Sequence, residues 1–291
     1  MKKAKAVNER TRTNRKKNTS PLSKLYMALV FLFLYAPIVV LIIFSFNDTK
    51  TMSRSVWSGF TFRWYVRLWE DSLIQEAVWN TVIIAVVAAL FSTLFGTVAA
   101  VGISHMRGWR KKVVMNLTNF PMVNPEIVTG VSMMLLFVFG AQMLHISSLG
   151  IWSIIIAHVT FCLPYVILSV LPKLRQMDPH LYEAAQDLGC PPLRAFIKVV
   201  LPQIMPGVVT GMIMAFTLSI DDFVITYFCS GTTQTLPIYI YSMTRRRVSP
   251  EINALSTLMF VAVLALLIII NLRQARQEAA RARDRRAAGR S

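Results

Sequence analysis

The sequence predicts an all-α integral membrane protein with six transmembrane helices. Of the 291 residues, 55% are hydrophobic and 15% are charged, whereas soluble domains carry about 25% charged residues. Six apolar runs approach or exceed the roughly 20 residues that a helix needs to cross a bilayer. These runs are continuous, which indicates helices rather than the alternating strands of a membrane barrel.

The six predicted spans are separated by polar segments of unequal length. They are Leu25–Phe46, Thr81–Ile103, Ile127–Leu144, Ile151–Leu171, Ile204–Ser230 and Ala254–Leu272. The fifth run is apolar except for the adjacent acids Asp221 and Asp222. We therefore expect one transmembrane domain over residues 25–272, flanked by basic tails at 1–24 and 273–291.

Basic residues are concentrated in alternate segments between the spans. With both tails placed inside, the inner segments hold 24 Lys and Arg residues and the outer segments hold 7. Basic loops favour the cytoplasmic side, so this asymmetry predicts that both termini are cytoplasmic. The net charge of +17 then reflects topology and contact with anionic lipid. The basic residues form no recognisable nucleic-acid-binding module, which disfavours that role.

The cysteines and the first apolar run argue against a disulfide framework, a zinc site and a cleavable signal peptide. Cys162, Cys190 and Cys229 lie in or beside predicted spans without paired or metal-type spacing, so they predict neither a disulfide framework nor a zinc site. The first apolar run is too long for the core of a cleavable signal, and we interpret it as a permanent span.

The first outer segment, residues 47–80, is rich in aromatic side chains. They are Trp57, Phe60, Phe62, Trp64, Tyr65, Trp69 and Trp79. Aromatic residues at this density beside a span favour the headgroup interface, where a ring is half apolar and half wet. The segment predicts an interfacial helix, and docking of an external partner is the alternative.

The third apolar region is interrupted before it resumes at Ile127. The interruption contains Pro121, Asn124, Pro125 and Glu126. Polar and helix-breaking residues are costly where lipid could reach them. We therefore expect a broken helix that faces the protein interior.

The polar segment between the fourth and fifth spans, about residues 172–203, is the most patterned part of the chain. Pro179 can begin a helix, and Gly189 can end one. Pro191 and Pro192 restart the chain before an amphipathic block that leads into the fifth span. The pattern predicts two short helices, presented at an angle on the cytoplasmic side, where small and acidic residues could contact another protein.

This segment resembles the cytoplasmic loop of the inner-membrane permease subunits of ABC importers. The family pattern is Glu-Ala-Ala, three residues, Gly, nine residues, Ile, one residue, Leu-Pro. The matching residues here are Glu183, Ala184, Ala185, Gly189, Leu201 and Pro202. The chain departs from the pattern at Val199, which stands in the Ile position. We call residues 172–203 the EAA loop.

The resemblance implies a fold, a set of partners and a mechanism. The fold is that of a type I ABC importer permease (MetI-like), and the EAA loop would fit a cleft of an ATPase dimer and transmit its closure to the spans. A second permease subunit would complete the pore, and an extracytoplasmic binding protein would deliver the cargo.

The chain's own content agrees with the resemblance. It contains no phosphate-binding loop of the Gly-x-x-x-x-Gly-Lys-Ser/Thr type, and it shows no catalytic or metal-binding constellation. We expect a transport subunit that is not an enzyme and has no cofactor, with ATP bound by the partner.

Further segments resemble the second permease of spermidine/putrescine transporters over about residues 25–272. They are residues 45–47, 57–61, 64–65, 158–164, 216–222 and 249–255. This resemblance implies that polyamines are the cargo and that an extracytoplasmic polyamine-binding protein is a partner.

The acidic residues inside the apolar regions fit such a cargo. They are Asp221, Asp222 and Glu126. A polyamine is a flexible polycation, so its path should offer carboxylates and aromatic faces. Acidic side chains are costly to place within a membrane, so those found there usually have a function. Adjacent helical residues point about 100° apart, so we expect one of the two aspartates to contact the cation. The alternative is a capping box from Ser219 to Asp222 that restarts a helix.

Three other functions are alternatives to polyamine import by an ABC transporter. The same fold could import iron, sulfate or a small osmolyte, although an anion would favour helix N-termini and basic residues over two aspartates. An ion-coupled secondary transporter would also use buried carboxylates, but it would show about twelve spans in repeated halves. A membrane enzyme lacks residues to carry catalysis.

Overall fold

The computed structural model describes residues 21–48, 57–144, 149–178, 180–246 and 250–288. Most of the basic N-terminal tail and Pro179 lie outside this described part, as do the last three residues. The described chain is helical apart from one isolated antiparallel bridge between Asn47 and Phe60.

The helices follow the order that the apolar runs predict. They are α2 (Pro21–Phe44), α3 (Arg63–Glu70), α4 (Ser72–His105), α5 (Gly108–Val123), α6 (Glu126–Leu144), α7 (Ile151–Gln176), α8 (His180–Asp187), α9 (Pro192–Ala195), the π-helix η1 (Phe196–Val200), α10 (Leu201–Asp221), α11 (Val224–Cys229), α12 (Leu236–Arg246) and α13 (Pro250–Ala288).

Six helical stretches are long and apolar enough to cross a membrane, which confirms the predicted number. They are Leu22–Phe44, Ser72–His105, Glu126–Leu144, Ile151–Gln176, Pro192–Asp221 and Glu251–Ile269. The second stretch begins nine residues before the predicted span because Asp71 caps α4 there, its carboxylate accepting the N–H of Leu73 at 2.9 Å. Polar residues in the first turns extend α4 beyond its apolar part.

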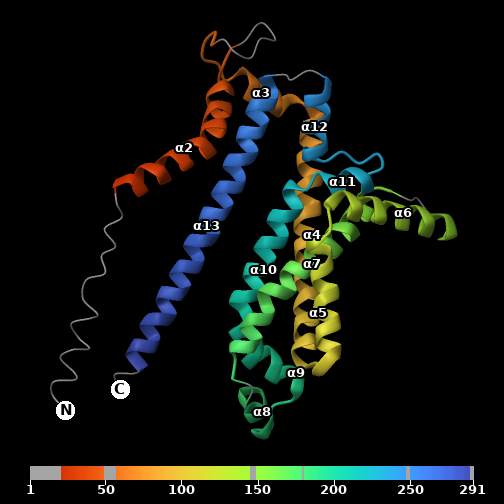
Figure 1. Ribbon diagram of the computed structural model, residues 1–291, viewed down its shortest axis with the longest axis vertical. Helices are drawn as coiled ribbons and strands as arrows, with labels where there is room; N and C mark the ends of the chain where they lie inside the picture. The colour runs from red at the N-terminus through yellow and green to blue at the C-terminus, as the bar shows by residue number, and fades with distance from the viewer. Residues whose placement is uncertain (1–20, 49–56, 145–148, 179, 247–249, 289–291) are drawn as a thin grey trace.

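The centre of the molecule is a bundle of α4, α7 and α10, which make the most extensive contacts with one another (Figure 1). Glycines allow this close approach. A Cβ at Gly96 of α4 would lie 2.7 Å from Val166 of α7, and one at Gly207 of α10 would lie 2.7 Å from the carbonyl oxygen of Ser169. Small residues serve this purpose in membranes, where packing replaces the hydrophobic effect between helices.

Helices α2 and α13 form a separate arm beside this bundle (Figure 1). They contact each other, and α13 also contacts α3 and α12. None of the most apolar part of α2 is buried within the chain. The apolar surface of this arm therefore faces lipid or another subunit. Helix α13 continues to Ala288, so the predicted C-terminal tail begins as an extension of the last span.

One end of the molecule holds α3, α12 and the start of α4 (Figure 1). Trp64 of α3 is buried there, and its indole N–H donates to the carbonyl of Asn47 at 2.8 Å. Tyr239 of α12 donates to Asp71 at 3.2 Å. Burial first, and then the nearby Asp71 carboxylate, raises the pKa of Tyr239 to about 12, so the phenol remains a donor at neutral pH.

The aromatic first outer segment divides between these buried contacts and the surface. Phe60, Phe62, Trp69 and Trp79 are exposed. The short helix α3, with Trp64 and Leu68 buried and Trp69 exposed, has the two-sided character expected of an interfacial helix.

The predicted break in the third apolar region is present, but its surroundings differ from the expectation. Helix α5 ends at Val123 and α6 begins at Glu126. Pro125 and Glu126 are exposed, so the break does not face the interior of this chain. Helix α6 packs mainly on α11 and extends away from the bundle, which leaves its first turn on the surface.

We predict that Gly207→Ala destabilises the bundle by about 1–3 kcal/mol, because the added methyl group meets backbone atoms of α7. The purified protein should show a lower apparent melting temperature. Gly102→Ala on α4 is the control: a Cβ there meets nothing within 4 Å, and alanine is the better helix former. An equal melting temperature for Gly207→Ala and wild type would contradict close α7–α10 packing.

Candidate functional site

The EAA loop forms two short helices at the opposite end of the molecule from α3 (Figure 1). Helix α8 ends in a Schellman motif: the N–H of Gly189 donates to Gln186 and the N–H of Cys190 donates to Ala185. Gly189 has a φ of +80°, a conformation that glycine adopts without the cost a Cβ brings. The glycine therefore ends α8 and turns the chain toward α9.

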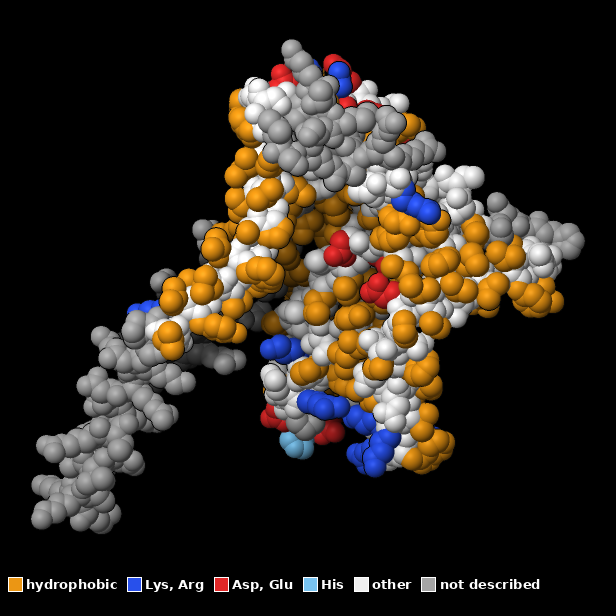
Figure 2. Space-filling model, turned by 45° about the horizontal axis from the view of Figure 1, so that its top comes forward, with side chains coloured by type: hydrophobic (Ala, Val, Ile, Leu, Met, Phe, Trp, Pro, Cys, Tyr) orange, Lys and Arg blue, Asp and Glu red, His pale blue; other side chains and the backbone are white. Residues whose placement is uncertain are grey.

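The loop exposes apolar side chains next to charged ones. Leu188 is 89% exposed and Leu193 is 71% exposed. Glu183 and Ala184 are also exposed, whereas Ala185 is half-buried. Figure 2 shows Lys and Arg side chains gathered toward the same end of the molecule. Large apolar side chains in a polar, projecting loop are typical of a surface that another protein covers.

The loop is joined to the bundle without a flexible linker. Helix α9 passes directly into η1 and then into α10. Ala195 and Val200 are buried, and Tyr182 and Phe196 pack against the bundle core. Pro202 lies in the first turn of α10, directly after the π-helical segment η1. A displacement of the loop would therefore be transmitted to α10.

The fifth apolar run is broken at its acidic pair rather than continuous to Ser230 as predicted. Helix α10 ends at Asp221, and α11 begins at Val224. The Asp222 carboxylate accepts the backbone N–H of Thr226 at 2.8 Å and its hydroxyl at 2.9 Å. Asp222 thus caps the new helix itself. The helix restart that the capping-box alternative predicted is therefore present, but the box from Ser219 is wrong, because the Ser219 hydroxyl bonds to His158 at 2.6 Å instead.

The two aspartates have different surroundings. The side chain of Asp222 is 6% exposed and lies 3.4 Å from Nε2 of His158, whereas Asp221 is exposed. Glu126, at the start of α6, is also exposed and lies close enough to Asp221 to interact electrostatically with it. Within the described part of the chain, neither Asp221 nor Glu126 forms a salt bridge.

Figure 2 shows acidic side chains at mid-height, surrounded by hydrophobic surface. An exposed carboxylate in apolar surroundings favours a nearby cation, which stabilises its charged form. The structure thus leaves Asp221 and Glu126 exposed, whereas the side chain of Asp222 is buried beside His158.

An aromatic cluster follows the acidic pair. Phe223, Tyr227 and Tyr241 have ring centroids 4.4–6.1 Å apart. Tyr227 and Tyr241 are exposed, and the guanidinium of Arg245 lies 5.7 Å from the Tyr241 ring centroid. These rings therefore offer faces that can accept a cation. Phe223 and Tyr227 are four residues apart at α11, whereas Tyr241 comes from α12, so spacing alone could not reveal the whole cluster.

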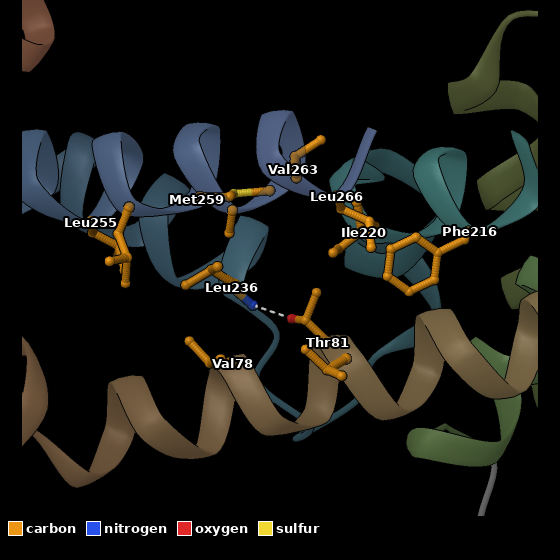
Figure 3. A pocket seen from close by; sticks show the side chains of 12 residues that line it. Val78, Thr81, Phe216, Ile220, Leu236, Leu255, Met259, Val263 and Leu266 are labelled. Carbon is orange, nitrogen blue, oxygen red and sulfur yellow. Dashed lines mark hydrogen bonds between the residues drawn. The ribbon is translucent and has the colours of Figure 1, made fainter. Parts of the chain in front are cut away.

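A cavity of about 240 Å³ between α4, α10 and α13 is a different kind of site (Figure 3). Its lining includes Val78, Phe216 and Met259 and contains no acidic residue. Its one hydroxyl, that of Thr81, accepts the N–H of Leu236 at 2.8 Å and donates to the carbonyl of Ala77 at 2.7 Å. With its polar atoms satisfied and no charge, the cavity does not suit a cation.

These features define a class of protein: a polytopic helical membrane protein with a projecting loop that exposes apolar side chains, and with exposed acids among its apolar stretches. The family described as "Binding-protein-dependent transport system inner membrane component" matches residues 92–283, more than half of the chain. The chain belongs to this family. It is a multi-pass inner-membrane transport subunit, not an enzyme, and members of the family carry no cofactor.

Two relatives are similar over nearly the whole chain. The "Putrescine transport system permease protein PotI" of Escherichia coli K12 is 41% identical over 268 residues, covering 91% of this chain and 95% of its own. The "Spermidine/putrescine transport system permease protein PotC" of Haemophilus influenzae is 40% identical over 253 residues, covering 86% of this chain and 95% of its own.

Solved structures support the fold. A bacterial ABC transporter involved in the import of alginate matches with a TM-score of 0.66 at 18% identity, covering 88% of this chain and 94% of that chain. An amino acid ABC transporter with histidines matches with a TM-score of 0.53 at 19% identity, covering 75% and 100%. The predicted importer-permease fold is confirmed.

Proposed function

We propose that this chain is the second transmembrane permease of an ATP-driven importer for polyamines such as putrescine and spermidine. The observation that carries the proposal is that the carboxylates of Asp221 and Glu126, both within apolar stretches of the chain, are exposed and form no salt bridge among the described residues. The two relatives at about 40% identity, named for putrescine and for spermidine/putrescine transport, support the same cargo. A polycation needs carboxylates and aromatic faces on its path.

The proposed assembly contains four kinds of subunit. This chain forms half of the pore and a second permease forms the other half. An ATPase dimer binds the EAA loop, and an extracytoplasmic polyamine-binding protein delivers the cargo. The exposed apolar surface of α6 and of the α2–α13 arm supports a partner within the membrane.

In the proposed topology, both termini and the EAA loop are cytoplasmic, and α3 and α12 lie on the outer side. The excess of Lys and Arg in the segments on the EAA-loop side supports this orientation. The transmembrane domain extends over residues 25–272, with basic tails at 1–24 and 273–291.

The proposed mechanism is alternating access. Closure of the ATPase dimer moves α8, and the continuous run from α9 through η1 carries that movement into α10. The residues proposed to couple the ATPase are Glu183, Ala184, Ala185, Gly189, Leu201 and Pro202. Because α10 ends at Asp221, the same movement changes the position of the proposed cation contact.

We predict ATP-dependent uptake of radiolabelled putrescine and spermidine by proteoliposomes that hold the whole complex. Uptake should persist when a protonophore collapses the ion gradient while ATP is maintained. Excess unlabelled polyamine should compete, whereas ferric iron, sulfate or a small osmolyte should not. Transport of one of these other solutes without transport of polyamine would refute the cargo. Loss of uptake with the protonophore would indicate a secondary transporter.

We predict that Gly189→Val reduces uptake at least tenfold while leaving membrane insertion intact. A β-branched residue at a φ of +80° costs about 1–2 kcal/mol and disfavours the turn after α8. Gly189→Asn should retain most uptake, because asparagine tolerates this conformation.

A second glycine supplies the control for backbone strain. Gly108, the first residue of α5, has a φ of +66° and nothing within 4 Å of an added Cβ, so Gly108→Val introduces similar strain outside the EAA loop. Equal uptake by Gly189→Val and wild type would contradict a coupling role for the turn after α8 in the EAA loop.

A further inference from the structure

His158 lies in the middle of α7 and is buried, with 2% of its surface exposed. Both of its ring nitrogens are engaged. Nδ1 lies 2.6 Å from the hydroxyl oxygen of Ser219, and Nε2 lies 2.9 Å from the hydroxyl oxygen of Thr226. Ser219 is in the last turn of α10 and Thr226 is in α11. One side chain of α7 therefore spans the break between the two helices.

The hydrogen bonds share one direction when the His158 ring is neutral and protonated at Nε2. A carboxylate only accepts, so the Thr226 hydroxyl donates to Asp222, 2.9 Å away. The Thr226 oxygen is then free to accept the Nε2–H of His158. In this tautomer Nδ1 is the acceptor, so Ser219 donates to it. The result is a chain from Ser219 through His158 and Thr226 to Asp222 in which each of these links pairs a donor with an acceptor.

These hydrogen bonds also determine the direction of the side chain of Asp221, the residue before Asp222. The Asp222 carboxylate is 6% exposed and is held by the backbone N–H and the hydroxyl of Thr226. Adjacent residues of a helix point about 100° apart. Fixing Asp222 inward at the end of α10 therefore sets the direction of Asp221, which is exposed.

We propose that His158 is a positioning residue: acting through Ser219 and Thr226, it fixes the α10–α11 break so that, of the two aspartates, only Asp221 faces the cation's path. The proposal rests on the proposed function only for the role of Asp221 in cation passage. The positioning itself follows from the buried hydrogen bonds. His158 does not touch the cargo.

The direct test measures the exposure of position 221. A single cysteine is introduced by Asp221→Cys, which leaves Asp222 in place, after Cys162, Cys190 and Cys229 are each replaced by alanine. The labelling rate with 2-aminoethyl methanethiosulfonate, a small cation, is measured in proteoliposomes holding the whole complex. Thr226→Val then removes the hydroxyl with little change of shape, and Thr226→Ser restores it.

We expect Thr226→Val to change the labelling rate of the cysteine at position 221 at least fivefold, and Thr226→Ser to keep the original rate. Thr232→Cys, at an exposed position after α11, is the reference, and its labelling should not respond to Thr226→Val. If the Thr226→Val complex does not assemble, Ser219→Ala breaks the same chain at its other end and should change labelling in the same way. Unchanged labelling in an assembled variant would overturn the positioning role.

Adding polyamine during the labelling of position 221 tests the proposed function separately from the positioning role of His158. Putrescine or spermidine should slow labelling at position 221 if Asp221 lies on the path. Absence of protection together with a response to Thr226→Val would refute the role of Asp221 in transport while supporting the role of His158.

Discussion

The hydrogen-bond chain that ends on Asp222 is the interaction on which the proposed transport site depends. Within a membrane, backbone and side-chain polar groups need partners from the protein, so a helix can break there only if its freed groups are satisfied. At the end of α10, the Asp222 carboxylate accepts the N–H of Thr226, and the Thr226 hydroxyl lies 3.1 Å from the carbonyl oxygen of Asp222. His158 in turn bonds to the hydroxyls of Ser219 and Thr226. Asp221, next to this satisfied break, is left exposed and without an ion-pair partner among the described residues.

Helix α7 connects this break to the rest of the chain. Helix α4 packs against α7 at Gly96, and α10 packs against α7 at Gly207 and Gly211, where an added side chain would crowd α7. Helix α7 also carries His158. The EAA loop enters α10 without an intervening flexible segment. A bundle packed this closely favours movement of whole helices over gradual deformation, as alternating access requires.

Much of this arrangement could be predicted from the sequence because it depends on local composition. Hydropathy identified six spans, the prolines near residue 125 indicated a break, and Gly189 indicated the end of α8. The part played by α7 could not be predicted, because His158 meets Ser219 and Thr226 only after α7 and α10 pack. Spacing suggested that Ser219 could cap a helix, but its hydroxyl is hydrogen-bonded to the buried imidazole of His158 instead. Exposure of Glu126 likewise depends on how α6 leaves the bundle.

The most direct test of the central claim is uptake of radiolabelled putrescine and spermidine by the whole complex carrying Asp221→Asn. This change keeps the size of the side chain and removes its charge. Glu76→Gln removes an exposed charge near the start of α4, on a different helix from Asp221, and serves as the control. Uptake lowered at least tenfold by Asp221→Asn, with basal ATPase activity intact and Glu76→Gln unaffected, is the predicted result. Wild-type uptake by Asp221→Asn would contradict a role for this carboxylate in cation passage.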